Sequence, residues 1–292
     1  MTPQESEEFI VNKEEAGSRL DKLLADRYAP HFSRTYFADL IEDELVLLNG
    51  KIPKKRLAPV EGDVIEIYFR VKDLSDLKPE NIPLDIVFED EHLIIINKSA
   101  GFVVHPAPGN WSGTFVNALL YHCQVEKDGS VRPGIVHRLD KDTTGLLMGA
   151  KTLEAQKRLM NLFATRSIYK EYRAITIGKP PEGRVETLIG RNPKNRQEMA
   201  VLLDKGKTAV TEVEVIKFSE PFALVKCAIE TGRTHQIRVH LKHLKTPILG
   251  DPVYGSVSNN LKYKADRPLL HAYRLNFIHP FTNKLMDITA PL

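Results

Sequence analysis

The sequence predicts an α+β protein with two domains, because three features of the 292-residue chain indicate this class. Strand-like apolar runs and amphipathic helical segments both occur along the chain. Several strand-like runs follow one another directly, as at 85–91 and 92–98, instead of alternating strictly with helices. A polar segment with two prolines, residues 73–84, divides a short first part from a long second part and is typical of a linker.

The first part, residues 17–72, follows an acidic N-terminal tail and has the pattern of a small α+β domain. Apolar residues at 20, 23 and 24 share one helical face, and a serine precedes each helical segment as a possible cap. Asn49-Gly50 is a strong hairpin-turn signal. We expect helices over 17–26 and 33–41, capped by Ser18 and Ser33, and strands over 45–48 and 64–69.

The second part, residues 85–292, contains more strands than helices. Residues 92–98 are apolar throughout most of their length and predict a buried strand. We expect strands over 85–91, 92–98, 169–178, 210–216 and 223–229, and helices over 114–123, over 152–166 with Thr152 as cap, and from Thr234 with Ile237, Leu241 and Leu244 on the buried face.

Chemistry concentrates in the stretch 134–147, where five ionisable side chains and two threonines lie between two glycines. Apolar residues flank the charged segment on both sides, so we expect a loop held between two buried strands. A calcium loop is excluded by spacing, because its twelfth position would be Lys151 where glutamate is required.

Three interpretations of this loop remain. Asp140, Asp142 and Thr144 fit the phosphatase pattern Asp-x-Asp-x-Thr, but only half of the four residues before Asp140 are apolar. A second interpretation makes one carboxylate a nucleophile or base, with Arg138 and His137 serving a polyanion or a leaving group. The third is a solvated loop with a surface ion pair, which would contribute little to stability.

Composition limits the functional classes. The excess of 41 Lys and Arg over 38 Asp and Glu is weak support for a polyanionic partner, and residues 1–72 alone hold 11 against 14. No apolar run is long enough for a membrane span and no signal core precedes the first part, so we expect a cytoplasmic protein without a membrane partner. Cys123 and Cys227 are far apart and predict reduced, buried thiols.

Two further groups of polar residues have alternative explanations. His235, His240 and His243 do not share one helical face, so we predict no zinc site and no other metal. The segment 190–197 is basic and turn-prone; Arg191 and Arg196 could contact phosphates, or the segment could be a solvated loop.

Residues 137–145 as a whole resemble the signature loop of the RluA-type RNA pseudouridine synthases, with Asp140 on the family's essential aspartate. The run Asn97-Lys98-x-x-Gly-x-x-Val-His-Pro and the motif Lys-x-Tyr172-x-Ala are also similar. The resemblance implies a mixed, mainly antiparallel sheet flanked by helices. It also implies that Tyr172 stacks on the target uracil, Arg238 pairs with Asp140, Arg138 fills the space of the flipped base, and Ile237 and Leu241 exclude water.

Residues 17–72 resemble the alpha-L RNA-binding domain, whose RNA face would include Arg19, Ser33, Arg34 and Lys51. The resemblance to the RluA-type family implies isomerisation of uridine to pseudouridine without cofactor or metal, by one of several covalent routes. Residues 103–119 are similar to the branch that acts on large-subunit ribosomal RNA, so we expect this RNA or a pre-ribosomal particle as partner of a monomer. A tRNA substrate, or a catalytically silent RNA-binding assembly factor, is the alternative.

Overall fold

The structure, a computed structural model, describes residues 6–28, 32, 34–54, 57–69, 77–106, 112–123, 125, 133–193 and 195–292, and only the backbone of residues 196 and 197. Ser33, residues 73–76 of the expected linker and residues 107–111 lie outside the described residues. The chain folds as two compact units, one built mainly from residues 1–78 and one that holds most of residues 79–292. No helix in the described ranges is long and apolar enough to cross a membrane.

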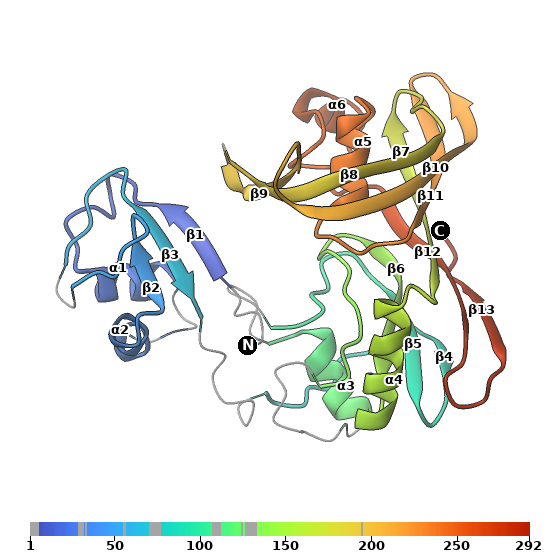
Figure 1. The fold of residues 1–292 in the computed structure, drawn as a ribbon, viewed down its shortest axis with the longest axis horizontal. Coiled ribbons are helices and arrows are strands. Elements are labelled where there is room, and N and C mark those ends of the chain that lie inside the picture. Colours follow the sequence, from blue (N-terminus) through green and yellow to red (C-terminus); the bar gives the residue numbers. More distant parts are fainter. Residues whose placement is uncertain are drawn as a thin grey trace. The chain divides into compact units, whose positions relative to one another are not determined.

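The first unit is a three-stranded antiparallel sheet in the order β1-β3-β2 with two helices (Figure 1). Its core is rich in aromatic side chains: Phe37 and Phe69 are almost fully buried, and Tyr28 packs against both rings. The elements are β1 (Ser6–Ile10), α1 (Leu20–Arg27), α2 (Arg34–Glu42), β2 (Val46–Leu48) and β3 (Val64–Tyr68).

Three details of the first unit differ from the sequence predictions. Residues 6–10, predicted as an acidic tail, form an edge strand because Phe9 is buried in the core while its neighbours face solvent. Arg19, not Ser18, is the N-cap of α1. Asn49 and Gly50 both have positive φ, as the predicted tight turn requires. The turn does not lead directly into a second hairpin strand: Lys51 forms an isolated bridge to Leu48, and β2 pairs with the later strand β3.

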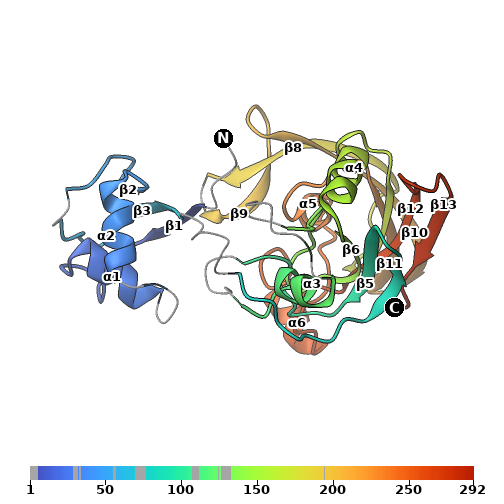
Figure 2. The same ribbon diagram turned by 90° about the horizontal axis from the view of Figure 1, so that it is seen from below.

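The second unit is built on one ten-stranded sheet in the order β4-β5-β6-β12-β7-β11-β10-β8-β9, with β13 beside β12 (Figures 1 and 2). All neighbours are antiparallel except β6 and β12, so the predicted α+β class with a mixed, mainly antiparallel sheet is confirmed. The strands are β4 (Ile86–Glu89), β5 (Leu93–Lys98), β6 (Thr144–Ala150), β7 (Tyr169–Ile177), β8 (Gly183–Asn192), β9 (Asn195–Leu202), β10 (Lys207–Ser219), β11 (Phe222–Ile229), β12 (Leu270–Ile278) and β13 (Leu285–Thr289).

Within the described residues, four helices accompany this sheet: α3 (Phe115–Cys123), α4 (Leu153–Ala164), α5 (Gln236–His243) and α6 (Val257–Lys262). Helix α4 packs on β6, and α5 packs against β9 and β10 (Figure 1). Thr152 caps α4 as predicted, because its hydroxyl accepts the Ala155 N–H at 3.1 Å. Thr234 is not the cap of α5: the helix begins one residue later, with His235 as N-cap in the left-handed conformation.

The charged stretch before β6 is a loop, as predicted, but only its second flank is a strand. Ile135 forms a single bridge to Gly149, whereas residues 144–150 form β6 and are almost all buried. Gly145 permits the close parallel approach of β6 to β12, because a Cβ there would lie 2.3 Å from the Ala272 carbonyl oxygen and φ is +102°. The loop therefore leaves the sheet where β6 meets β12.

Candidate active site

An acid and an arginine that are far apart in the sequence meet in the second unit. Asp140 lies in the loop before β6 and Arg238 lies on α5, and the Arg238 Nη1 donates to Asp140 Oδ2 at 3.0 Å. The Arg238 side chain is only 7% exposed, whereas the Asp140 side chain is 26% exposed. The predicted pair is therefore present, and its carboxylate is the member that solvent can reach.

Asp251 is a second carboxylate on the same guanidinium, and no role was predicted for it from the sequence. Its two oxygens accept hydrogen bonds from Arg238 Nε at 2.7 Å and Nη2 at 3.0 Å, a bidentate arrangement. The backbone N–H groups of Val253 and Tyr254 also donate to it, each at 2.9 Å. Burial alone would raise the pKa of Asp251, but the hydrogen bonds and charge of Arg238 outweigh burial and hold that pKa below its usual range.

His235 and Tyr254 complete the polar shell around Arg238. The Tyr254 ring lies 5.0 Å from the guanidinium carbon, and its hydroxyl contacts His235 Nδ1 at 2.8 Å and accepts the Met199 N–H at 2.8 Å. His235 Nε2 lies 3.9 Å from Asp140 Oδ2. Burial lowers the pKa of His235 and outweighs the opposing charge of Asp140. From the sequence, His235 was a candidate only for a zinc site, so its place beside Asp140 was missed.

Tyr172 and the Asp140–Arg238 pair share one cavity. Tyr172 lies on β7, paired with Cys227 of β11 and Ala272 of β12, and its side chain is buried. Burial and the nearby charge of Asp140 raise the pKa of its hydroxyl, so the ring is uncharged near neutral pH. The cavity has a volume of about 100 Å³ and its lining includes Arg138, Asp140, Tyr172, His235, Ile237 and Arg238.

Two of the predicted substrate-binding residues do not line this cavity. Leu241, on α5, is fully buried and does not line the cavity. His137 turns away from Asp140: its Nε2 accepts the Met148 N–H at 2.8 Å and its ring stacks on Phe163 at 4.6 Å. Burial, together with the charge of Lys170, lowers the pKa of His137 to about 3, so the imidazole is neutral. His137 therefore anchors the loop to β6.

The expected RNA face of the first unit is described only in part, because Ser33 lies outside the described residues. Arg19 and Arg34 converge on one carboxylate: both donate to the buried Asp21, with nitrogen to oxygen distances of 2.9 to 3.1 Å. Lys51 is exposed beside the Asn49-Gly50 turn. Arg191, in the second unit, is exposed on β8, and the side chain of Arg196 on β9 lies outside the described residues.

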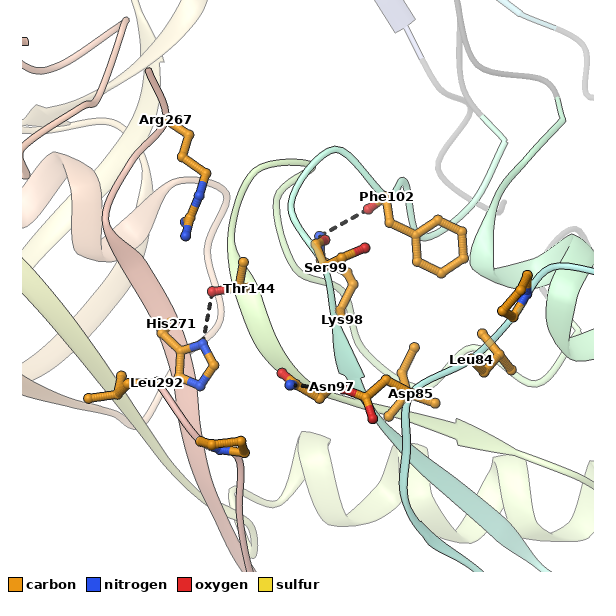
Figure 3. A pocket seen from close by; sticks show the side chains of 13 residues that line it. Leu84, Asp85, Asn97, Lys98, Ser99, Phe102, Thr144, Arg267, His271 and Leu292 are labelled. Atoms are coloured by element: carbon orange, nitrogen blue, oxygen red, sulfur yellow. Dashed lines mark hydrogen bonds between the residues drawn. The ribbon is translucent and has the colours of Figure 1, made fainter. Parts of the chain in front are cut away.

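Lys98 supports the Asp140 loop from the opposite side, a role that the sequence did not reveal. Its ammonium donates to the backbone carbonyls of Ser99 at 2.8 Å and Phe102 at 3.0 Å, the latter marked in Figure 3. It also donates to the Lys141 carbonyl at 2.7 Å and thus ties the end of β5 to the residue after Asp140. Burial lowers its pKa to about 8, against the opposing effect of Asp142 and Asp140. On this side the Thr144 hydroxyl also contacts His271 Nδ1 at 2.8 Å (Figure 3).

One group of side chains among the described residues could supply three metal ligands, and it lies outside the cavity. Ligand atoms of Glu89, His122 and Cys123 fall within 4.8 Å of one another. Glu89 already accepts a hydrogen bond from Lys151 at 2.6 Å and contacts His122 at 3.0 Å. Burial raises the pKa of the Cys123 thiol to about 11, which disfavours the thiolate that a metal would bind. We assign no role to this group.

Comparisons with known proteins place this geometry in a family. Residues 92–243 match the family model described as RNA pseudouridylate synthase. The chain is 43% identical over 294 residues to "Ribosomal large subunit pseudouridine synthase D" of Neisseria meningitidis serogroup A, covering 97% of this chain and 78% of that protein. It is 42% identical over 296 residues to the Escherichia coli K12 protein of the same name, with 97% and 89% covered.

Solved structures with a similar fold carry the same family description. The solved structure of human RNA Pseudouridylate Synthase Domain Containing 1 aligns with a TM-score of 0.58 and 27% identity, over 73% of this chain and 85% of that chain. A second human protein, RNA Pseudouridylate Synthase Domain Containing 4, aligns with a TM-score of 0.55 and 28% identity, over 71% and 88%. The chain belongs to the RNA pseudouridine synthase family.

Proposed function

We propose that this enzyme converts specific uridines of large-subunit ribosomal RNA to pseudouridine, with Asp140 as the reacting carboxylate. The observation that carries the proposal is the Arg238–Asp140 pair at 3.0 Å in a cavity that Tyr172 also lines. The names of the bacterial relatives support ribosomal RNA as substrate, since both act on the large subunit by name. We further propose that the protein works as a cytoplasmic monomer, which size-exclusion chromatography of the purified protein would test.

The isomerisation needs one bond broken and one formed. The bond from uracil N1 to ribose C1′ breaks, a bond from uracil C5 to C1′ forms, C5 loses its proton and N1 gains one, so no oxidant, reductant or external group is consumed. Arg238 binds Asp140 Oδ2, and Oδ1 has no hydrogen bond within the described part of the chain. Oδ1 is thus the oxygen available to attack C1′ or the uracil ring, or to remove a ribose proton.

The surrounding side chains would hold the extruded base. Flipping a nucleotide out of an RNA stack costs a few kcal/mol, which contacts in the pocket must offset. We propose that the Tyr172 ring stacks on the uracil and that Ile237 excludes water from it, because both side chains line the cavity beside Asp140. Arg138 is exposed at the same cavity, where its guanidinium could occupy the position that the base vacates.

The first unit would provide additional RNA affinity. We propose that residues 17–72 form an alpha-L RNA-binding domain, followed by a linker over 73–84 and a catalytic domain over 85–292. Support comes from the convergence of Arg19 and Arg34 on Asp21, which holds two guanidinium groups in fixed positions. Lys51 and Ser33 would belong to the same face.

The decisive experiment compares Asp140→Asn with Asp142→Asn, a matched change two residues away in the same loop. Purified variants are incubated with transcripts of large-subunit rRNA and with tRNA, and pseudouridines are mapped at nucleotide resolution. We expect the wild type and Asp142→Asn to modify the rRNA, and Asp140→Asn to bind rRNA with nearly unchanged affinity but to leave every uridine intact. Modification of tRNA alone would show that the substrate is tRNA and not rRNA. If the wild type bound rRNA without modifying it, the protein would be a catalytically silent assembly factor.

A further inference from the structure

A second cavity adjoins the candidate active site. It has a volume of about 410 Å³ and lies between the Asp140 loop, the end of α4, β7 and the end of β11. Four cationic side chains line it, Arg138, Arg166, Lys170 and Arg233, against the single carboxylate of Glu230. The two cavities share Arg138, Tyr172, Ile229, Gly232 and Arg233. A molecule in the second cavity would therefore lie next to whatever Asp140 and Tyr172 hold.

Lys170 is the unusual member of this group. The residue is 7% exposed and lines the cavity. Its ammonium nitrogen is not among the fully buried atoms without a partner, and within the described residues it has no hydrogen bond and no ion pair, so its donors open to the cavity. Its recorded contact is a cation–π approach to the Phe163 ring, with Nζ 5.8 Å from the centroid. An ammonium carries three donors, and a buried charge is ordinarily paired. Burial and the charge of Arg166 both lower the pKa of Lys170, so the free protein holds this cation at a cost.

The neighbouring side chains do not supply an anionic partner for the Lys170 ammonium. Glu230, the one carboxylate in the lining, pairs with Arg184 and lies 3.7 Å from Arg166. Arg233 Nε donates to the Thr208 carbonyl at 2.9 Å, which fixes its guanidinium near the rim. His137 is neutral, as its low pKa requires. The cavity thus has an excess of positive charge around a buried donor, which is the complement of an anion.

Strand geometry connects this donor to the active site. Lys170 and Tyr172 are two residues apart on β7, so their side chains leave the strand on the same face. An RNA strand that places its uracil against Tyr172 would bring an adjoining phosphodiester to Lys170. A phosphate has unesterified oxygens that can accept from several donors at once, which suits a lysine flanked by arginines.

We propose that the second cavity binds the backbone phosphate adjoining the target uridine, with Lys170 as its buried donor and Arg166 and Arg233 at its rim. The proposal rests on the proposed function, since it takes the ligand of the first cavity to be a flipped uridine. It assigns Lys170 a substrate-binding role in place of a structural one.

The first test measures how RNA affinity depends on salt. Binding of a short labelled oligouridylate is followed by fluorescence anisotropy across a series of salt concentrations for the wild type, Lys170→Met and the control Lys157→Met, an exposed lysine on α4. Each phosphate contact to a single strand contributes about 0.7 to the slope of log K against log salt. We expect Lys170→Met to reduce the slope by about that amount and Lys157→Met to leave it unchanged.

A second variant keeps the test informative if Lys170→Met does not fold. Arg166→Gln changes an exposed residue at the rim of the same cavity and should also reduce the slope. If Lys170→Met and Arg166→Gln both bind RNA with the slope of the wild type, the proposed phosphate site is wrong. That outcome differs from failure of the proposed function, in which the wild type itself would form no pseudouridine in rRNA.

Thermal unfolding tests the proposal without RNA. Removal of an unpaired buried charge should raise the melting temperature of Lys170→Met above that of the wild type, whereas loss of a structural cation–π contact should lower it. Inorganic phosphate should stabilise the wild type more than Lys170→Met. A lower melting temperature for Lys170→Met, with equal stabilisation of both proteins by phosphate, would overturn the proposal whether or not RNA is bound.

Discussion

The Asp251→Asn substitution should weaken both the fold and the chemistry, because Asp251 holds Arg238 in the position from which it reaches Asp140. The wild-type carboxylate accepts two hydrogen bonds from the guanidinium and two from the backbone, and it is fully buried. An asparagine of the same size keeps at most one acceptor oxygen, presents an N–H₂ group to the guanidinium and removes the negative charge. Arg238 would then be a buried cation with Asp140 as its remaining charged partner.

The magnitude follows from the burial of this pair. Removal of one partner from a buried ion pair typically costs 3–5 kcal/mol, and we expect about 3 kcal/mol here because Asp140 still accepts from Arg238. For a domain of this size the loss corresponds to a fall in melting temperature of roughly 6–12 °C. The matched control is Asp287→Asn, since Asp287 also accepts from both Nε and Nη2 of an arginine, Arg274, but at the surface. Its loss should change the melting temperature little.

Two measurements test this reasoning. Circular dichroism melts of wild type, Asp251→Asn and Asp287→Asn give the stabilities, and single-turnover assays on rRNA give the chemical step, which should slow in Asp251→Asn alone. The pKa of Asp251 is lowered in the folded protein: burial opposes ionisation, but the Arg238 hydrogen bonds outweigh it. Its stabilisation is therefore present above the ordinary value of 3.8 and is lost as pH falls toward the folded pKa. If Asp251→Asn melts like Asp287→Asn and keeps full turnover, Asp251 does not position Arg238.

Other residues of the site give further predictions. Arg138→Ala should lower single-turnover rates by roughly 10- to 100-fold, with RNA affinity nearly unchanged, because the vacated base position is no longer filled; a fluorescent base next to the target would report the missing flip. Tyr172→Phe should keep most activity and Tyr172→Leu should lose roughly 5- to 150-fold, as expected for stacking; equal losses would favour a role for the hydroxyl. His137 has its folded pKa lowered to about 3 by burial and by Lys170, so the native state should lose at most about 1.4 kcal/mol per pH unit as pH falls from 6.5 toward 3. Urea unfolding of wild type and His137→Asn at pH 7 and pH 5 would measure this, and an equal loss in both proteins would contradict it.

Local sequence patterns predicted most elements of the second unit because the signals are themselves local. The apolar run of β5 and the cap of α4 at Thr152 depend on neighbouring residues, and both are present. The strand β1 was missed because its signal depends on a distant partner. Glu7 and Glu8 are typical of a solvated tail, and only pairing with β3, more than fifty residues away, makes the segment an edge strand.

The site residues that lie in contiguous sequence motifs were predicted. The residues that only the three-dimensional fold brings to the site were missed. The resemblance to the RluA-type family implied the pair of Asp140 and Arg238; burial of an arginine on α5 predicts a carboxylate partner but does not say which one. Asp251 follows a glycine and precedes a proline, a pattern typical of an exposed turn, and nothing local shows that it lies behind Arg238. Lys98 and Lys170 occupy strand positions where lysine usually faces solvent, yet both are buried because the strands lie inside the sheet.

The two carboxylates that share Arg238 differ in one respect that separates their roles. A buried ion pair is a poor source of stability compared with apolar side chains of the same volume, so a cluster of two acids and one arginine is not explained by folding alone. Asp251 is fully buried and accepts hydrogen bonds from Arg238 and from two backbone N–H groups. Asp140 is 26% exposed and has an oxygen with no hydrogen bond in the described part of the chain. We therefore propose that Asp251 orients the guanidinium, that the guanidinium orients Asp140, and that the second oxygen of Asp140 meets the uridine.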